Sequence, residues 1–127
     1  MQTKLIPTLK IGNLEINPPI IQGGMGVKVS GANLASAVAD TGCAGIIASA
    51  GLGQFENFSR SECVKINEDA FRYEIRKAKK RTLGIIGVNI MVALSNYDNL
   101  VQVAIEENVD LIISGAGLPL NLPQYLN

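Results

Sequence analysis

The segment Gln22-Gly-Gly-Met-Gly26 contains the residue types best suited to bind a ligand. It directly follows Ile20 and Ile21, so an apolar run that predicts a buried strand ends in an amide and three glycines. Glycine has no side chain and tolerates positive φ angles, which lets the backbone approach a flat cofactor or a phosphate closely. The segment therefore predicts a cofactor enzyme with its site at the carboxyl end of a parallel strand.

Two later strands end in a similar way, in Val88-Asn-Ile-Met91 and in Ser114-Gly-Ala-Gly117. Burying an unpaired amide costs ~1–3 kcal/mol, and a bound polar cofactor would supply the missing partner. The alternative is that the amides of Gln22 and Asn89 only satisfy neighbouring loop backbone. For Met25, the alternative to a contact with a ligand is ordinary packing in the core.

The elements around these segments predict an α/β fold. Four apolar runs without alternation are typical of parallel strands that are covered on both faces. An alternating pair of segments around Gly12-Asn13 predicts an N-terminal hairpin that plugs one end of a barrel. The four predicted strands are Ile20–Gln22, Ala44–Ala48, Leu83–Met91 and Asp110–Gly117.

A closed (β/α)8 TIM barrel needs about 250 residues. We therefore expect residues 1–127 to be a partial barrel domain, the N-terminal half of a (β/α)8 TIM barrel that stops after about four parallel strands with intervening helices. An open doubly wound sheet is the main rival. It is disfavoured because Val29 occupies the third position of a Gly-x-Gly-x-x-Gly pattern and no acidic residue ends the second strand.

The helices are predicted from capping residues and helical spacing. The stretch Gln54–Lys65 is long for a strand-to-helix connection, and it is interpreted either as a lid over the substrate or as a surface excursion. The basic run Arg76–Arg81 is interpreted as a solvated helix terminus. The expected helix starts are Ser30, Asn67, either Ser95 or Asn96, and a final turn within Asn121–Asn127.

The composition excludes several classes of function. The 127 residues carry no net charge, which disfavours a nucleic-acid partner. No apolar run is long enough for a membrane span. The two cysteines have no metal-ligand spacing, and Cys43 is expected in the core and Cys63 at the surface, so a reduced, cytoplasmic setting without a metal site is predicted. Histidine, the commonest general base, does not occur in the chain.

The motifs Pro19–Met25, Gly42–Ile47, Gly87–Met91 and Ser114–Pro119, in this order, resemble the nitronate monooxygenase family, also called 2-nitropropane dioxygenases. The FMN-dependent enoyl-(acyl-carrier-protein) reductases share the barrel and the motifs. The resemblance covers nearly the whole chain and matches the N-terminal part of the family, without separating the two branches.

The resemblance implies an FMN-binding barrel that acts on a small-molecule substrate. The segment Gly115-Ala116-Gly117 would border the substrate, and the catalytic base of the family, a histidine, would lie beyond this chain. The resemblance places Gly24, Met25, Gly26 and Asn89 at the flavin. With Gln22 and Gly23, which the strand end and the glycine loop themselves suggest, they are the predicted cofactor-binding residues.

Three functions remain open at this point. The first is oxidation of an alkyl nitronate by O₂ to a carbonyl compound and nitrite. The second is reduction of an enoyl thioester with a reduced nicotinamide, and the third is an inactive fragment without catalysis of its own. An unpaired edge after the fourth strand predicts that the isolated chain self-associates.

Overall fold

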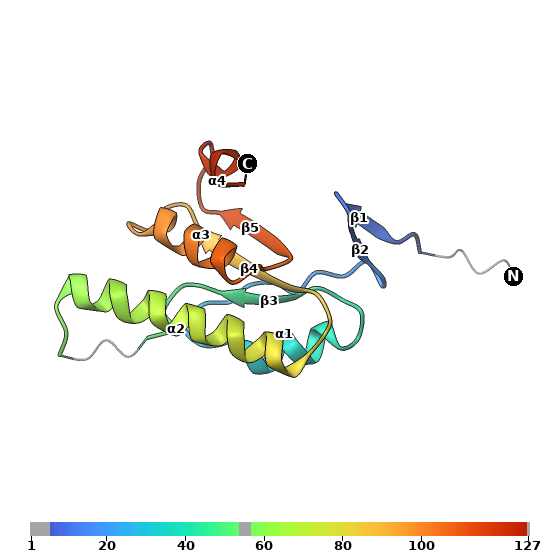
Figure 1. Cartoon of the computed structure of the whole chain (residues 1–127), viewed down its shortest axis with the longest axis horizontal. Coiled ribbons are helices and arrows are strands. Elements are labelled where there is room, and N and C mark those ends of the chain that lie inside the picture. Colours follow the sequence, from blue (N-terminus) through green and yellow to red (C-terminus); the bar gives the residue numbers. More distant parts are fainter. Residues whose placement is uncertain (1–5, 54–56, 127) are drawn as a thin grey trace, which may run out of the picture.

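The computed structural model describes residues 6–53 and 57–126. Its elements alternate between strands and helices along most of the chain (Figure 1). They are β1 (Leu9–Ile11), β2 (Leu14–Ile16), α1 (Ala32–Ala39), β3 (Gly45–Ala48), α2 (Arg60–Arg81), β4 (Ile86–Met91), α3 (Tyr97–Glu106), β5 (Leu111–Gly115) and α4 (Leu122–Tyr125).

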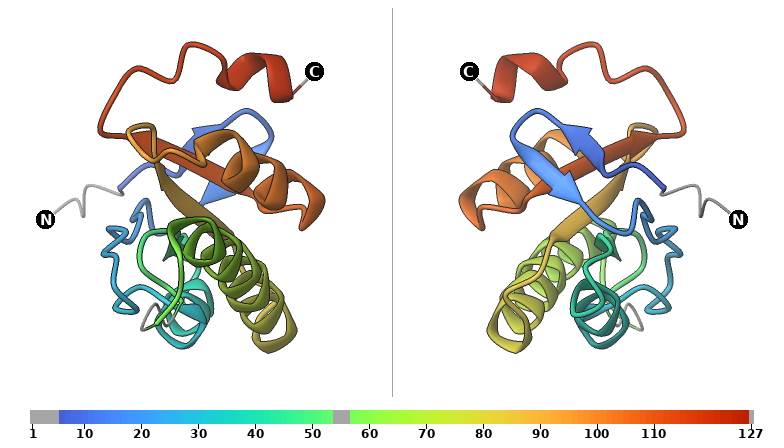
Figure 2. Two further views of the ribbon diagram at one scale, coloured as in Figure 1. Left: turned by 90° about the vertical axis from the view of Figure 1, so that its left-hand side faces the viewer. Right: turned by 90° about the vertical axis from the view of Figure 1, so that its right-hand side faces the viewer.

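The three longer strands form one parallel sheet in the order β3-β4-β5. Each pair is connected through a helix, with α2 between β3 and β4 and α3 between β4 and β5. In both figures α1 and α2 lie side by side along one side of this sheet (Figures 1 and 2). The predicted α/β fold with parallel strands and intervening helices is thus present.

The first predicted strand is reduced to a single bridge between Ile21 and Ala44. Its burial was predicted wrongly, because Ile20 is 55% exposed and Ile21 is 37% exposed. The segment still runs beside β3: Ala44 N–H donates to Ile20 C=O, and Gln22 N–H donates to Ala44 C=O. No other described strand lies on its outer side, so its apolar side chains are left uncovered.

The hairpin was predicted correctly, with β1 and β2 paired antiparallel around Gly12. Ile16 is fully buried and belongs to a small apolar cluster with Ala44 and Ile46. The half-buried Leu111 packs against the same cluster. The hairpin therefore covers the amino ends of the strands and leaves their carboxyl ends open (Figure 1).

The main core lies between the sheet and the helices. Alternate side chains of β4, namely Ile86, Val88 and Ile90, are almost completely buried against Phe71, Ile75 and residues of α3. The intervening positions of β4 face the opposite, concave side. Because β5 forms the edge of the sheet, its residues are only partly buried, although the sequence predicted cover on both faces.

The start of α2 differs from the prediction. Ser59 caps this helix in a capping box with Glu62, so residues 60–65 of the expected irregular stretch are helical. Asn67, the predicted cap, lies inside the helix and is buried. Of the rest of that stretch, residues 57–59 lie outside helices and strands and residues 54–56 lie outside the described residues, so neither the lid nor the surface excursion is tested.

The remaining boundaries are close to the expected ones. The strand predicted from Leu83 starts at Ile86, and Leu83 itself is fully exposed in the preceding turn. Asn96 occupies the N-cap position of α3, as expected, although its side chain makes no capping hydrogen bond. Cys43 is buried, as predicted.

Candidate functional site

The carboxyl ends of β3 and β4 meet the glycine loop at one rim of the sheet. Ser49 N–H, just after β3, donates to Asn89 C=O on β4. Val27 N–H, just after the glycine loop, donates to Ala50 C=O over 2.8 Å. Two of the segments that the sequence predicted at one edge of the sheet, the glycine loop and the end of β4, are therefore both bonded to the loop after β3.

Gln22 uses its side-chain amide to complete the edge of β3. Its Oε1 accepts from Ile46 N–H at 3.1 Å, and its Nε2 donates to Ile46 C=O at 3.1 Å. Nε2 also donates to Ser30 Oγ at 3.2 Å. The amide of Gln22 thus takes the place of a strand backbone, as the alternative reading of the sequence allowed, and it needs no ligand as a partner.

Asn89 differs from Gln22. It lies on the concave face of β4, half-buried, and its side-chain amide makes no hydrogen bond within the described part of the chain. The backbone of Gly24 passes directly over it, because a Cβ atom added to Gly24 would lie 2.5 Å from Asn89 Cβ and 2.7 Å from Nδ2. An amide that is half-buried and not paired is available to a polar ligand.

The rest of the glycine loop is exposed or closely packed on backbone. Met25 is 63% exposed, so it does not fill the core. Gly23 has open space where a side chain would be, whereas a Cβ at Gly26 would lie 3.1 Å from Ala50 C=O. The loop therefore presents one large polarizable side chain and nearly bare backbone at the rim.

The loop after β3 is held by a residue that the sequence analysis assigned to another role. Asn67 Oδ1 accepts from Leu52 N–H at 3.0 Å, and Asn67 Nδ2 donates to Ser49 C=O at 2.8 Å. Its side chain fixes the small-residue loop against which Gly26 packs. An asparagine followed by two acidic residues indicates a helix cap, and no local signal in the sequence points to this contact instead.

The segment predicted to border the substrate lies beyond β4 along the same rim. Gly115 C=O accepts from Val92 N–H at 2.8 Å, and a Cβ at Gly117 would lie 2.9 Å from Val92 Cβ. Ala116 has a positive φ of 54°. Ser114, expected at the rim, faces the helix layer instead, where its Oγ lies 2.8 Å from the hydroxyl of Tyr97.

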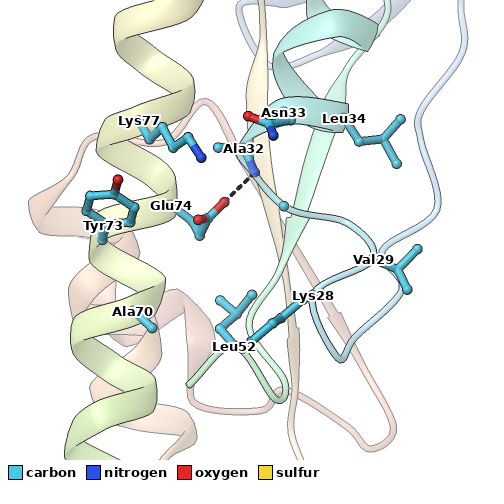
Figure 3. Close-up of a pocket in the computed structure, with 11 residues that line it drawn as sticks. Lys28, Val29, Ala32, Asn33, Leu34, Leu52, Ala70, Tyr73, Glu74 and Lys77 are labelled. Atoms are coloured by element: carbon cyan, nitrogen blue, oxygen red, sulfur yellow. Dashed lines mark hydrogen bonds between the residues drawn. The ribbon is translucent and has the colours of Figure 1, made fainter. Parts of the chain in front are cut away.

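A groove of about 500 Å³ opens outside the rim, between α2 and the start of α1 (Figure 3). Its centre holds Glu74, whose carboxylate accepts from Ala32 N–H at 2.6 Å. Lys77 and Tyr73 extend from the same helix into its wall. Glu74 already binds the amino end of α1, so the groove is the place where α1 and α2 meet. Asn89 is not among the residues that line it.

The described residues offer few groups that could do more than bind a ligand. They contain no group of three His, Cys, Asp or Glu side chains placed to hold a metal ion. No described helix is both long and apolar enough to cross a membrane. The carboxyls with a lowered pKa, such as Glu107 beside Arg76, belong to α2 or to the end of α3, and none of them is part of the rim loops.

Comparison with known proteins gives one family match and several structural matches. The model of the family described as nitronate monooxygenase matches residues 7–120. A search of curated proteins found no match.

Two solved structures of FabK from Thermotoga maritima are similar to the chain. A single-residue mutant of FabK is 33% identical with a TM-score of 0.67, and the match covers 85% of this chain and 32% of that one. A second FabK structure is 31% identical with a TM-score of 0.66, with 85% of this chain and 30% of that one covered. The chain thus spans about a third of the length of these structures, and its fold corresponds to part of a barrel.

Proposed function

Because this chain belongs to the nitronate monooxygenase family, we propose that it forms part of an FMN-dependent oxidoreductase and supplies one wall of the flavin site. The family match and the FabK structures support this function at the level of the family. The observation that carries the proposal is the amide of Asn89, which has no partner in the described chain and lies directly beneath Gly24.

The residues present fit a planar, polar cofactor. Gly23 has open space where a side chain would be and so leaves room for a ring to approach the backbone, and the exposed Met25 offers a polarizable surface to pack against it. Asn89 would donate to or accept from the polar edge of the ring or the ribityl chain. The side-chain amide of Gln22 is already bonded to Ile46, so Gln22 contributes to this wall by holding the loop against β3 and not by binding the cofactor.

Bound FMN would supply the electron transfer, for which none of these side chains is suited. The chain's own part is to bind the cofactor, orient it and border the substrate at Gly115-Ala116-Gly117. No histidine occurs in the chain, so no residue here is assigned as the catalytic base.

We propose oxidation of an alkyl nitronate by O₂ to a carbonyl compound and nitrite as the reaction. Reduction of an enoyl-(acyl-carrier-protein) thioester is the second candidate, and the family and structural matches are equally consistent with it. A reduced, cytoplasmic setting and a small-molecule substrate belong to the same proposal.

The test starts from the purified protein that carries this sequence. An absorption spectrum of FMN released from the protein would support the flavin site. A colourless protein that does not quench the fluorescence of added FMN would contradict it. Oxygen uptake with a nitronate, compared with nicotinamide oxidation with an enoyl thioester, then separates the two reactions.

Replacement of Asn89 tests the carrying observation directly. Asn89→Ala is expected to raise the dissociation constant of FMN about tenfold, because it removes one hydrogen bond to a polar ligand. The control is Asn99→Ala on the outer face of α3, where the amide donates to Glu68 at 3.0 Å. Equal FMN affinity in both variants would remove Asn89 from the site.

A further inference from the structure

Ser30 is an almost completely buried hydroxyl, 1% exposed, that directly follows the glycine loop. We infer that Ser30 is a positioning residue, which fixes the backbone of residues 23–26 in the conformation that presents Gly24 to Asn89. This inference rests on the proposed flavin site. Ser30 itself makes no hydrogen bond to Asn89 and is not exposed at the rim.

The hydroxyl of Ser30 uses its full hydrogen-bonding capacity on this loop. Oγ accepts from Met25 N–H at 2.9 Å and from Gln22 Nε2 at 3.2 Å, and it donates to Gly23 C=O at 3.2 Å. A hydroxyl has one donor and two acceptor positions. A single side chain therefore ties together Gln22, Gly23 and Met25.

The backbone of Ser30 connects the same loop to the sheet. Ser30 N–H donates to Met25 C=O at 2.9 Å, and Ala48 N–H at the end of β3 donates to Ser30 C=O at 3.0 Å. Through Gln22, the hydroxyl is also connected to Ile46 on β3. The loop is thus held against β3 by two contacts, one through the backbone of Ser30 and one through the side chain of Gln22, before any ligand binds.

This arrangement determines which backbone groups remain for a ligand. Met25 N–H is turned toward Ser30, while the N–H groups of Gly24 and Gly26 make no hydrogen bond to the described residues. Without the hydroxyl, Met25 N–H would lose its partner and the loop would gain alternative conformations. Preorganised donors bind more tightly because less ordering is needed on association.

The role as a helix cap, which the sequence predicts for Ser30, is not the one observed. The N-cap position of α1 is Gly31, which makes no side-chain capping bond. The first amide of the helix, Ala32 N–H, donates to Glu74 from α2 instead. The hydroxyl of Ser30 is directed entirely to the loop that precedes it.

Ser30→Ala tests the inference, with Ser36→Ala as the matched control. Ser36 is equally buried at 2%, but its hydroxyl bonds only to Asn33 C=O within α1. We expect Ser30→Ala to accelerate hydrogen exchange at the Met25 amide about tenfold and to raise the dissociation constant of FMN by a similar factor. Ser36→Ala should change neither quantity by more than about twofold.

The two readouts separate this inference from the proposed function. If the unsubstituted protein binds no FMN, the proposed function fails, and exchange at Met25 still decides whether Ser30 holds the loop. Unchanged exchange at Met25 in Ser30→Ala would overturn the inference. So would faster exchange combined with unchanged FMN affinity, because the loop conformation would then not matter for binding.

A second variant guards against a loss of folding in Ser30→Ala. Ser30→Cys keeps a weak donor and acceptor at nearly the same volume. It should give exchange at Met25 and FMN affinity between those of the unsubstituted protein and Ser30→Ala. If Ser30→Ala and Ser30→Cys both fold and give the values of Ser36→Ala, the hydroxyl is not needed and the inference is overturned.

Discussion

At the residue scale, the contact between Gly24 and Asn89 leaves no room for a side chain at Gly24. A methyl group at Gly24 would overlap Asn89, whereas a methyl group at Gly23 would meet nothing within 4 Å. The two adjacent glycines therefore have different structural requirements, although the sequence gives them equal weight.

Gly24→Ala is expected to destabilise the protein by about 1–3 kcal/mol, because the overlap must be relieved by moving either the loop or Asn89. Gly23→Ala is the control and should be neutral or slightly stabilising, since alanine reduces the entropy of the unfolded chain. Thermal denaturation of both variants measures the difference. Equal melting temperatures would mean that Gly24 does not pack on Asn89 in solution.

The comparison of Gln22 with Asn89 shows where sequence reasoning at this scale stops. Gln22 ends one apolar run and Asn89 lies within another near the end of its predicted strand, and the sequence analysis treats the two amides alike. Gln22 reaches the free N–H and C=O of Ile46 because Ile21 pairs with Ala44, which places the next residue, Gln22, beside the start of β3. That outcome depends on the register between two segments 24 residues apart, which no local pattern encodes.

At the element scale, α2 and α3 are joined by a cluster of charges around Glu107. Arg72 donates to Glu107 at 2.7 Å and to Glu106 at 2.6 Å, and Arg76 donates to Glu107 at 2.9 and 2.8 Å. Lys79 Nζ donates to the carbonyl of Glu107 at 3.0 Å. The basic run predicted as a solvated terminus thus holds the end of the next helix.

Glu107→Gln should lower the free energy of unfolding by about 1 kcal/mol at neutral pH, since the Glu107 side chain is 11% exposed but its arginine partners are partly solvated. Lys65→Gln, which breaks the exposed pair with Asp69, is the control and should have little effect. Urea denaturation of both variants measures these changes.

The effect of Glu107→Gln should depend on pH. The hydrogen bonds from Arg76, followed by those from Arg72, hold the pKa of Glu107 below its usual 4.5. A lowered pKa in the folded state means that the stabilisation is complete above about pH 5 and is lost as the pH falls through the lowered value. A difference between variant and unsubstituted protein that persists undiminished at pH 2 would contradict this assignment.

The sequence predicted the elements of this fold better than their ends. Apolar runs of the right length fixed β3, β4 and β5, because burial between layers needs little more than hydrophobicity. The start of α2 was missed by eight positions, from the observed cap Ser59 to the predicted cap Asn67. Both Ser59 and Asn67 are good capping residues, and Ser59 has in addition the Ser-x-x-Glu spacing of a capping box with Glu62. The contact of Asn67 with Ser49 and Leu52, by contrast, depends on the tertiary fold.

At the scale of the whole molecule, the sheet is open along β5. Leu111 and Ile113 on its concave face are only half-buried against the hairpin cluster. No described strand pairs with the outer side of β5. An open parallel edge with apolar side chains is a surface on which another chain can pair.

We propose that the 127-residue chain on its own self-associates through this edge. Ile113→Lys should shift it toward monomer in sedimentation equilibrium, because a charge on an edge strand opposes pairing. Leu83→Lys is the control, since Leu83 is exposed in the turn before β4, away from the edge. Loss of folding in Ile113→Lys would increase association, so a shift to monomer cannot arise from it. Monomer in the unsubstituted chain would refute the proposal.

The two ends of α1 depend on residues that come much later in the chain. Glu74, 42 positions after Ala32, binds the first amide of the helix, and Thr82, 42 positions after Asp40, bonds to the residue that ends it. During synthesis the amino-terminal part emerges first. On the ribosome α1 therefore remains without both of its terminal partners until residue 82 has left the exit tunnel.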